Sequence, residues 1–244
     1  LKLIAVDTPG HGSSPRISSS VTRLIDGLHY LKKNPFPPRI IPSVKKYFSG
    51  MSNYLEEEKA EDYKNIDSAI KRKNFIKQLQ IQSPFHHSLT RDTCSITRLG
   101  ASNKINVVPP VAWAEIDCRI LPDRTAEDFI NEIKYMMEPF DIKVETIMAF
   151  TSASSTTESE LYKAIKSTLK NLYPHSYIIP RVTTGFTDSH FTRDLGIQSY
   201  GFNPIIVPLK ELGRIHGNDE RININAFKQG VKDHLAIIKS LVYD

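Results

Sequence analysis

The sequence has few cysteines and no long apolar run, and both shortages limit what the protein can be. Its two cysteines, Cys94 and Cys118, fall within strand-like stretches, and neither belongs to a Cys-x-x-Cys pair. A reducing compartment or buried thiols fit this pattern best, so we lean towards the cytoplasm, but two cysteines leave the localisation open. No apolar stretch is long enough to cross a bilayer, and we expect no membrane segment in this chain.

Positive charge is not concentrated either, although the chain is mildly basic. The formal net charge is +5 and the isoelectric point is about 9.0, yet lysines and arginines are interspersed with acids, apart from short clusters such as 71–73. No aromatic-rich RNA signature accompanies them, and the pattern is typical of a solvated surface. We expect no nucleic-acid partner. A basic RNA-binding α+β domain is an alternative that rests only on the isoelectric point and a ferredoxin-like strand order.

The remaining composition is that of a soluble globular protein, with 40% hydrophobic and 24% charged residues. A chain of 244 residues can form one large domain or two ordinary ones. Because Leu1 already lies inside a strand pattern, we expect the chain to be a piece of a longer protein, with any signal peptide outside it.

Residues 1–150 predict a small two-layer α+β domain with an antiparallel sheet. Between 112 and 120, apolar and polar residues alternate with the two-residue period of a half-buried strand, placing Ile116 on one side and Asp117 on the other. The other expected elements, in chain order, are a strand at 1–8, a helix over 18–31, a strand at 93–101, a helix starting after Thr125 and a strand at 142–150.

Residues 35–92 interrupt this domain and predict a helical insertion. Prolines open the stretch, and charged clusters follow at 56–58 and 71–73. A structureless loop of this length is improbable in a compact domain. The apolar residues with helical spacing are Ile66, Ile70, Ile76 and Leu79.

A run of small polar residues at 151–157 is the expected boundary, which gives domains at 1–150 and 151–244. Thr157 with Glu160 resembles a capping box for the next helix. Strand-like runs at 177–182 and 198–202 alternate with helices, which indicates part of an α/β domain. With so few strands, its sheet is expected to need residues outside this chain.

Two histidines stand in turns and are candidates for chemistry. His11 has a glycine on each side, which clears space around the imidazole. His216 precedes a charged turn, and imidazole is the commonest protein ligand for zinc. His11 is equally explained as a polar turn residue, and His216 taken alone is better explained as a solvated loop histidine. The helix expected after His216 has as its apolar positions Phe227, Val231, Leu235, Ile238 and Leu241.

Four segments occur in order along the chain. They are Pro-Gly-His-Gly-Ser-Ser at 9–14, Asn-Val-Val-Pro-Pro-Val-Ala at 106–112, Phe-Thr-Asp-Ser-His-Phe at 186–191 and Arg-Ile-His-Gly-Asn-Asp-Glu-Arg-Ile at 214–222. Together they resemble the M20 metallopeptidase family. The Asn-Val-Val-Pro-Pro form and the insertion are most similar to the carboxypeptidase S and N-acyl-amino-acid hydrolase branch.

The resemblance implies a catalytic domain with two zinc ions that is interrupted by a lid, or dimerisation, domain. It makes 1–150 the lid, 151–244 the C-terminal part of the catalytic domain, and the N-terminal half absent. His216 is the one metal ligand that it carries onto this chain. A zinc site needs at least three protein ligands, so we expect the isolated chain to retain no zinc and to be inactive.

Three lid residues match family positions that touch substrate. His11 matches a histidine that reaches the partner subunit's site and steadies the oxyanion of the intermediate. Asn106 matches an amide side chain that helps to hold the substrate. Arg119 matches a basic residue that pairs with a carboxylate of the substrate. The alternatives are a turn or cap for Asn106, and for Arg119 an ion pair with Glu115 or Asp117.

Further positions agree less well with the family. Asp188 and Glu220 are candidates to orient metal ligands, or are local caps. At position 190 the chain has a histidine where several family members carry an arginine, which puts the contact of this position with the substrate's carboxylate in doubt. Arg193 is a possible substitute for that contact.

The resemblance implies that the parent protein is a zinc hydrolase acting on an N-acyl amino acid or on the C-terminal bond of a short peptide. The alternative from another class is a non-catalytic dimerisation or lid module. We expect a homodimer formed through the lid, because His11 has no other obvious site to serve.

Overall fold

The computed structural model describes residues 1–215 and 217–243, which form two compact units. Unit 1 comprises Leu1–Ser154 and Arg181–Phe186, and unit 2 comprises Ser155–Pro180 and Thr187–Asp244. Unit 1 contains a sheet with helices and a helical insertion, which confirms the expected α+β architecture.

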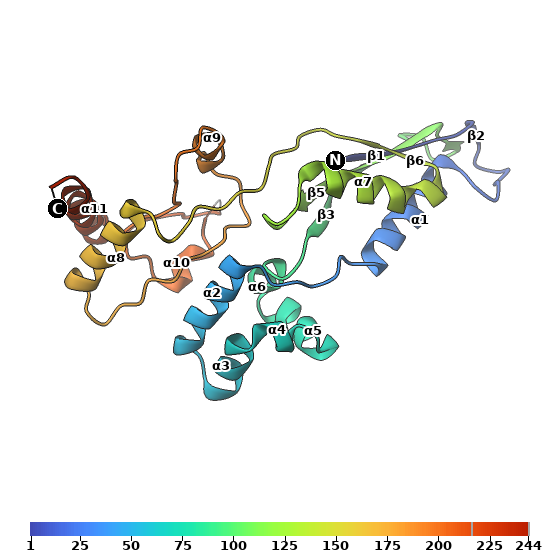
Figure 1. Ribbon diagram of the computed structural model, residues 1–244. Helices are drawn as coiled ribbons and strands as arrows, with labels where there is room; N and C mark the ends of the chain where they lie inside the picture. The colour runs from blue at the N-terminus through green and yellow to red at the C-terminus, as the bar shows by residue number, and fades with distance from the viewer. Residues whose placement is uncertain (216, 244) are drawn as a thin grey trace. The chain divides into compact units, whose positions relative to one another are not determined.

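The main sheet of unit 1 has four antiparallel strands in the order β3-β5-β1-β6. Their bounds are β1 Lys2–Val6, β3 Thr93–Gly100, β5 Val111–Arg119 and β6 Ile142–Glu145. The last strand is shorter than expected, since no described residue pairs with 146–150. A two-stranded ribbon, β2 Gly10–His11 with β4 Val107–Val108, continues the β1–β5 pairing (Figure 1).

Helices α1 (Ser20–Lys33) and α7 (Ala126–Met137) supply the other layer. Each begins at the residue type that stabilises a helix start: the side chains of Ser19 and Thr125 accept hydrogen bonds from the first-turn amides. Gly27 lets α1 approach the sheet, because a β-carbon there would lie 2.4 Å from Ile142 Cδ1.

The core of unit 1 lies between these helices and one face of the sheet. Along β5, Ala112, Ala114 and Ile116 are buried, whereas Asp117 and Arg119 are exposed, which confirms the expected alternation. The residues that the helices contribute to this core are Leu24, Leu28, Leu31, Phe129, Ile133 and Met137.

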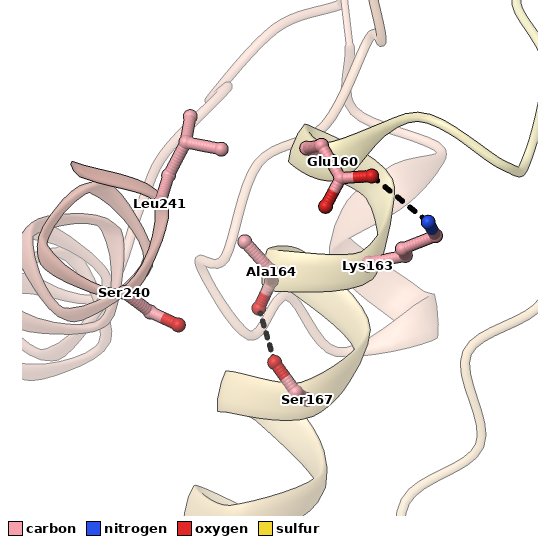
Figure 2. A pocket seen from close by; sticks show the side chains of 6 residues that line it. All are labelled: Glu160, Lys163, Ala164, Ser167, Ser240 and Leu241. Atoms are coloured by element: carbon pink, nitrogen blue, oxygen red, sulfur yellow. Dashed lines mark hydrogen bonds and ion pairs between the residues drawn. The ribbon is translucent and has the colours of Figure 1, made fainter. Parts of the chain in front are cut away.

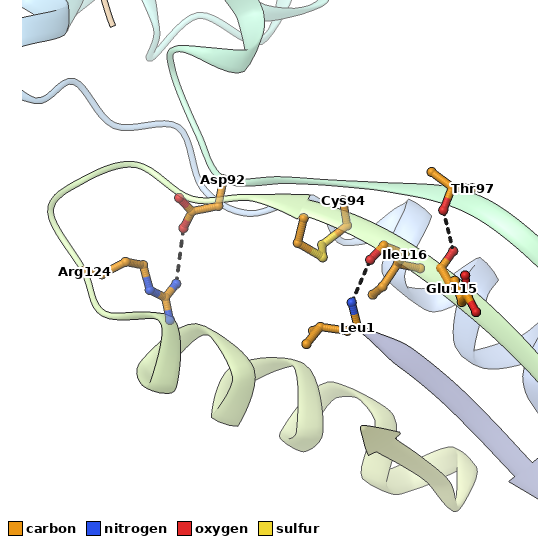
Figure 3. Close-up of a disulfide and its surroundings, with 8 residues drawn as sticks. Leu1, Asp92, Cys94, Thr97, Glu115, Ile116 and Arg124 are labelled. Carbon is orange, nitrogen blue, oxygen red and sulfur yellow. Dashed lines mark hydrogen bonds and ion pairs between the residues drawn. A yellow bond between two sulfur atoms is a disulfide. The ribbon is translucent and has the colours of Figure 1, made fainter. Parts of the chain in front are cut away.

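The insertion is helical as expected and is bound to the sheet domain by one buried carboxylate. The side chain of Asp92 has no exposed surface and accepts hydrogen bonds from Leu121 N (2.8 Å), Arg39 Nη2 (2.9 Å) and Arg124 Nη1 (3.3 Å). Both ends of the insertion are thereby fixed to the β5–α7 connection; Figure 3 shows the contact between Asp92 and Arg124. Its elements are α2 Pro42–Met51, η1 Ser52–Tyr54, α3 Glu57–Lys64, α4 Ile66–Ala69, α5 Lys73–Gln82 and α6 Pro84–Ser88.

The two cysteines are not free thiols, contrary to the expectation from sequence. Cys94 on β3 lies directly opposite Cys118 on β5, with a Cα–Cα distance of 4.1 Å, and the two form a disulfide (Figure 3). Sequence spacing missed the pair because strand register, rather than separation along the chain, brings two side chains together.

Unit 2 contains helices α8 (Glu160–Leu172), α9 (Ser189–Asp194), α10 (Leu209–Leu212) and α11 (Ile224–Tyr243). The cap of α8 is Ser159, whose side chain accepts from Tyr162 N at 3.1 Å, and not the expected pair of Thr157 and Glu160. No helix in the described ranges combines the length and apolar character needed to cross a bilayer.

The strands expected at 177–182 and 198–202 do not form. Both segments lack regular secondary structure, and the described part of unit 2 contains no strand. A strand needs a neighbour to satisfy its backbone groups, so an apolar, strand-like sequence alone does not suffice. Several side chains here are exposed, among them Tyr177, Ile197 and Ile206.

Helix α11 forms where expected, but its apolar face is not buried. The residues that α11 buries are Gly230, Asp233 and Ile237, and at Gly230 a β-carbon would lie 2.6 Å from Ile205 Cγ1. The apolar face that the sequence predicts is 40–55% exposed, at Phe227, Val231, Leu235, Ile238 and Leu241.

Candidate functional site

His11 lies on the ribbon formed by β2 and β4, opposite Val107. Its side chain is exposed, and its carbonyl accepts a hydrogen bond from Ser14 N at 3.0 Å. The neighbouring glycines therefore do what the sequence indicates: they place an imidazole on the surface at the end of a strand pair.

The hydrogen bonds of His11 fix its tautomer. The backbone amide of Ser13 donates to His11 Nδ1 at 3.2 Å, and Ser13 Oγ lies 2.7 Å from the same nitrogen. An amide can only donate, so Nδ1 accepts and the neutral ring carries its proton on Nε2. No described residue binds Nε2, which is left as a donor for a ligand. Ser13 is a residue that sequence reasoning missed, although its position two residues after His11 in a turn was the available signal.

Asn106 is the next residue along the ribbon, and the structure brings it to His11. Its carbonyl accepts a hydrogen bond from Gly12 N at 2.8 Å, one position beyond the His11–Val107 pair. Among the described residues nothing binds its side-chain amide, which is exposed. The backbone is held while the amide is available, as a substrate-binding role requires.

Arg119 ends β5 and is the one predicted lid residue already paired. Its Nη2 donates to Asp117 Oδ2 at 2.7 Å, on the same strand face, with both side chains nearly half exposed. This ion pair is the alternative that the sequence left open. An exposed pair contributes about 0–1 kcal/mol, so it does not prevent the guanidinium from exchanging to another carboxylate.

Arg119 and the His11–Asn106 pair lie at opposite ends of unit 1. Arg119 is eight residues along β5 from Val111, a separation of about 26 Å at the usual rise of a strand. The ribbon that carries His11 and Asn106 extends from the Val111 end (Figure 1). One small molecule therefore cannot contact both ends of the same subunit.

The predicted metal ligand, His216, lies outside the described residues. Within the described ranges, no three histidine, cysteine, aspartate or glutamate side chains come together as a metal-binding group. Glu220 and Asp188 are both exposed, and Asp188 is the cap residue of α9 without forming a side-chain cap bond.

His190 and Arg193 have local partners. His190 Nε2 lies 3.3 Å from Asp194 Oδ2, on the same helix. Arg193 donates to Ser155 Oγ at 2.9 Å and to Ser199 O at 2.6 Å, joining segments within unit 2. Arg193 is thus used to hold the chain together, which leaves it a poor substitute for a carboxylate-binding arginine.

A shallow groove runs between α8 and α11 in unit 2 (Figure 2). Three of its polar side chains have nearby partners: Lys163 Nζ pairs with Glu160 Oε1 at 2.8 Å, and Ser167 Oγ donates to Ala164 O at 3.2 Å. No set of polar atoms converges on a ligand position, so the groove is not a candidate catalytic centre.

Comparison with known proteins shows which family this chain is similar to. The family model described as "Peptidase dimerisation domain" matches residues 1–145. The chain is 26% identical to the probable carboxypeptidase S-like 2 of Dictyostelium discoideum, covering 98% of this chain and 46% of that protein. It is 27% identical to the N-fatty-acyl-amino acid synthase/hydrolase PM20D1 of Homo sapiens, covering 96% of this chain and 47% of that protein.

Among solved structures, the chain resembles an M20 family metallo-carboxypeptidase from Sulfolobus solfataricus. The TM-score is 0.63 at 16% sequence identity, over 98% of this chain and 57% of that one. The chain spans about half the length of the relatives it matches. At this identity, the structural likeness shows the fold.

Proposed function

Because the chain belongs to the M20 peptidase family, we propose that it is part of a zinc-dependent hydrolase that cleaves an amide bond next to a free carboxylate. The substrate is an N-acyl amino acid or the C-terminal bond of a short peptide. The names of two relatives support this class, one a carboxypeptidase S-like protein and the other an N-fatty-acyl-amino acid synthase/hydrolase.

The same proposal assigns a role to each domain. Residues 1–150 are the lid, and 151–244 are the C-terminal part of a catalytic domain. The rest of that domain belongs to a longer protein, here called the parent enzyme. The exposed apolar face of α11 and the unpaired segments of unit 2 support this proposal, because they are the surfaces that a missing sheet and its helices would cover.

The zinc in this proposal is implied by the family and not by the described residues. A catalytic zinc site needs three protein ligands and an open position, and the described residues form no such group. His216 is the ligand that the chain would contribute, and the isolated chain is expected to be inactive.

The separation of His11 and Asn106 from Arg119 carries the proposal that the enzyme is a homodimer. If all three bind one substrate, the first two must come from one subunit and Arg119 from the other. A two-fold axis through the lids does this for both sites at once. The family's dimerisation domain, matched over 1–145, supports the same arrangement.

The contacts of each lid residue define what it would do in that dimer. His11 Nε2–H donates to the oxyanion that forms at the attacked carbonyl, an interaction that strengthens as negative charge develops. The amide of Asn106 holds the substrate beside it. Arg119 exchanges Asp117 for the free carboxylate of the substrate, which it binds through two parallel hydrogen bonds.

Hydrolysis of a panel of N-acyl amino acids by the parent enzyme, loaded with zinc or cobalt, tests this function. Turnover that depends on the free carboxylate is expected. An enzyme shown to contain metal, yet inactive on every member of the panel, would contradict the proposal. Tight stoichiometric zinc binding and hydrolysis by the isolated 244 residues would exclude the alternative of a non-catalytic lid module.

A further inference from the structure

The net positive charge of the chain is concentrated in one segment of the insertion, residues 68–91. This segment contains five of the 32 lysines and arginines and none of the 27 aspartates and glutamates, so it carries the full +5 and the rest of the chain has no net charge. Helix α5 lies within it. The mixture of both signs that is typical of a solvated surface is therefore absent here.

Helix α5 presents this charge to solvent along one line. Lys73, Lys77 and Ile81 are four residues apart and therefore follow one another on one face of the helix. All three are exposed, Ile81 by 65%, and so is Lys71, just before the helix. The opposite face packs into the insertion through Leu79, which is 6% exposed. We call Lys71, Lys73, Lys77 and Ile81 the basic patch.

No acid of the described residues pairs with the lysines of the basic patch. Two acids that precede the segment have other partners: Asp62 pairs with Arg72, and Asp67 pairs with Lys45 at 2.5 Å. Helix α3, whose start carries the acidic run 56–58, lies apart from α5 (Figure 1). The positive charge of the patch is thus not neutralised within the insertion.

Helix α8 of unit 2 shows how an ordinary row of lysines differs. It carries Lys163, Lys166 and Lys170 at exposed positions with helical spacing. Lys163 pairs with Glu160 at 2.8 Å, and Lys170 donates to Pro174 O at 2.5 Å. Two of these three cations are bound by oxygen atoms of the chain, whereas none of the basic patch is bound by a described residue.

The basic patch is expected to remain at the surface of the parent enzyme. Burial of three unpaired ammonium groups is strongly unfavourable. The exposed face of α11 is apolar, so a further part of the enzyme can cover it without that cost. Whatever covers the basic patch must itself carry negative charge.

Two features favour an anionic lipid surface over other polyanions. Ile81 continues the row of lysines by one helical turn, and an isoleucine gains free energy by entering a lipid interface but not by lying against phosphates in water. The exposed arginine of the segment, Arg72, is already engaged by Asp62, and nucleic-acid recognition depends largely on forked arginine contacts. Lysine is a flexible point charge, which suits a fluid surface whose charges have no fixed positions.

We propose that the basic patch docks the insertion onto an anionic membrane surface. Helix α5 has 10 residues, which is too short to span a bilayer, so it lies along the surface. The lysines face the headgroups, and Ile81 enters between them. This docking goes beyond the proposed hydrolase activity and does not depend on it.

Co-sedimentation of the 244-residue chain with vesicles tests the docking. Vesicles of equal parts phosphatidylserine and phosphatidylcholine should bind the chain at low ionic strength far better than vesicles of phosphatidylcholine alone. At about 1 M salt, where the screening length is about 3 Å, this difference should disappear. Binding that does not increase with phosphatidylserine, or an increase that persists at high salt, overturns the proposal.

Two matched triple variants locate the surface. Replacing the three lysines of the basic patch by glutamine should weaken binding about a hundredfold, since each lysine near an anionic surface contributes about a factor of five. The same replacement of the three lysines of α8 removes an equal charge and should leave binding nearly unchanged. Circular dichroism verifies that both variants are folded. Equal losses would show a general effect of net charge and contradict the patch.

Ile81→Ser separates a lipid surface from a soluble polyanion. The variant retains every charge, and because Ile81 is 65% exposed its fold should be unaffected. Binding to phosphatidylserine vesicles should weaken about tenfold, whereas binding to heparin should not change. A chain that binds heparin but not the vesicles, or a variant that weakens both equally or neither, would contradict docking onto lipid.

Discussion

Unit 1 packs the apolar faces of its helices against its own sheet, whereas unit 2 leaves the apolar face of α11 exposed. In unit 1, the apolar face of α7 packs against a complete four-stranded sheet, and Ile133 has no exposed surface. In unit 2, the equivalent face of α11 is exposed at Ile238 and its neighbours, and no strand is present in the described part. One unit thus has a core packed around a sheet, whereas the other leaves an apolar helix face exposed.

The largest expected effect compares two isoleucines on helices. Ile133→Ala should destabilise unit 1 by about 4 kcal/mol, because it leaves a cavity in a packed core. Ile238→Ala in the isolated chain should cost less than about 1 kcal/mol, since the side chain is half exposed. Hydrogen exchange reports each unit separately and checks both values. Equal losses at the two positions would remove the contrast between the units.

A second comparison uses the buried carboxylate of each unit. Asp92 is bound by two arginines and an amide, whereas Asp233 accepts from Tyr173 Oη at 2.6 Å and Gln229 Nε2 at 2.8 Å and has no cation partner among the described residues. Asp92→Asn should cost about 3 kcal/mol, and Asp233→Asn about 1 kcal/mol. Denaturant unfolding of the two variants measures the difference, and a larger loss at Asp233 would show that unit 2 depends on its polar core.

The smallest effect concerns the pH dependence of the insertion. His86 lies 3.0 Å from Tyr47 Oη through Nε2 and 2.8 Å from Tyr63 Oη through Nδ1. Burial, and then the charge of Arg181, lower its pKa below the ordinary 6.5. The unfolded chain therefore takes up a proton first on acidification, so stability is full above about pH 6.5, falls as the pH drops through 6.5, and levels off below the folded-state pKa.

Thermal unfolding between pH 8 and pH 5 measures this loss in unit 1. His86→Gln retains hydrogen bonding to both tyrosines and should remove the share that belongs to His86. His87 and the N-terminal amino group of Leu1, whose pKa values are lowered in the same direction, contribute to what remains. An unchanged pH profile in the variant would show that the His86 contacts contribute nothing to the stability of unit 1.

The sequence predicted what depends on local pattern. The alternation along β5, the helices of unit 1 and the helical insertion follow from periodicity, and the structure confirms them. The prediction of strands at 177–182 and 198–202 was wrong, because a strand forms only where a neighbouring strand can pair with it. The Cys94–Cys118 disulfide was missed because it depends on register between β3 and β5.

The candidate site was predictable only as separate residues. The segments that hold His11, Asn106 and Arg119 could be found in the sequence, but their distances could not. That Gly12 joins His11 to Asn106, and that the length of β5 removes both from Arg119, follows from pairing between residues about 95 positions apart. Whether these residues bind substrate is still a prediction.

Unit 1 itself contains a second contrast. Its core is packed, but its proposed site residues lie at opposite ends of the sheet. Mixing two inactive variants of the parent enzyme, His11→Ala and Arg119→Ala, tests the central claim most directly. In a mixed dimer one site would receive His11 from one subunit and Arg119 from the other, so random exchange should restore about a quarter of wild-type activity. Variants that stay inactive after subunit exchange has been demonstrated, or a fully active monomer, would contradict the account.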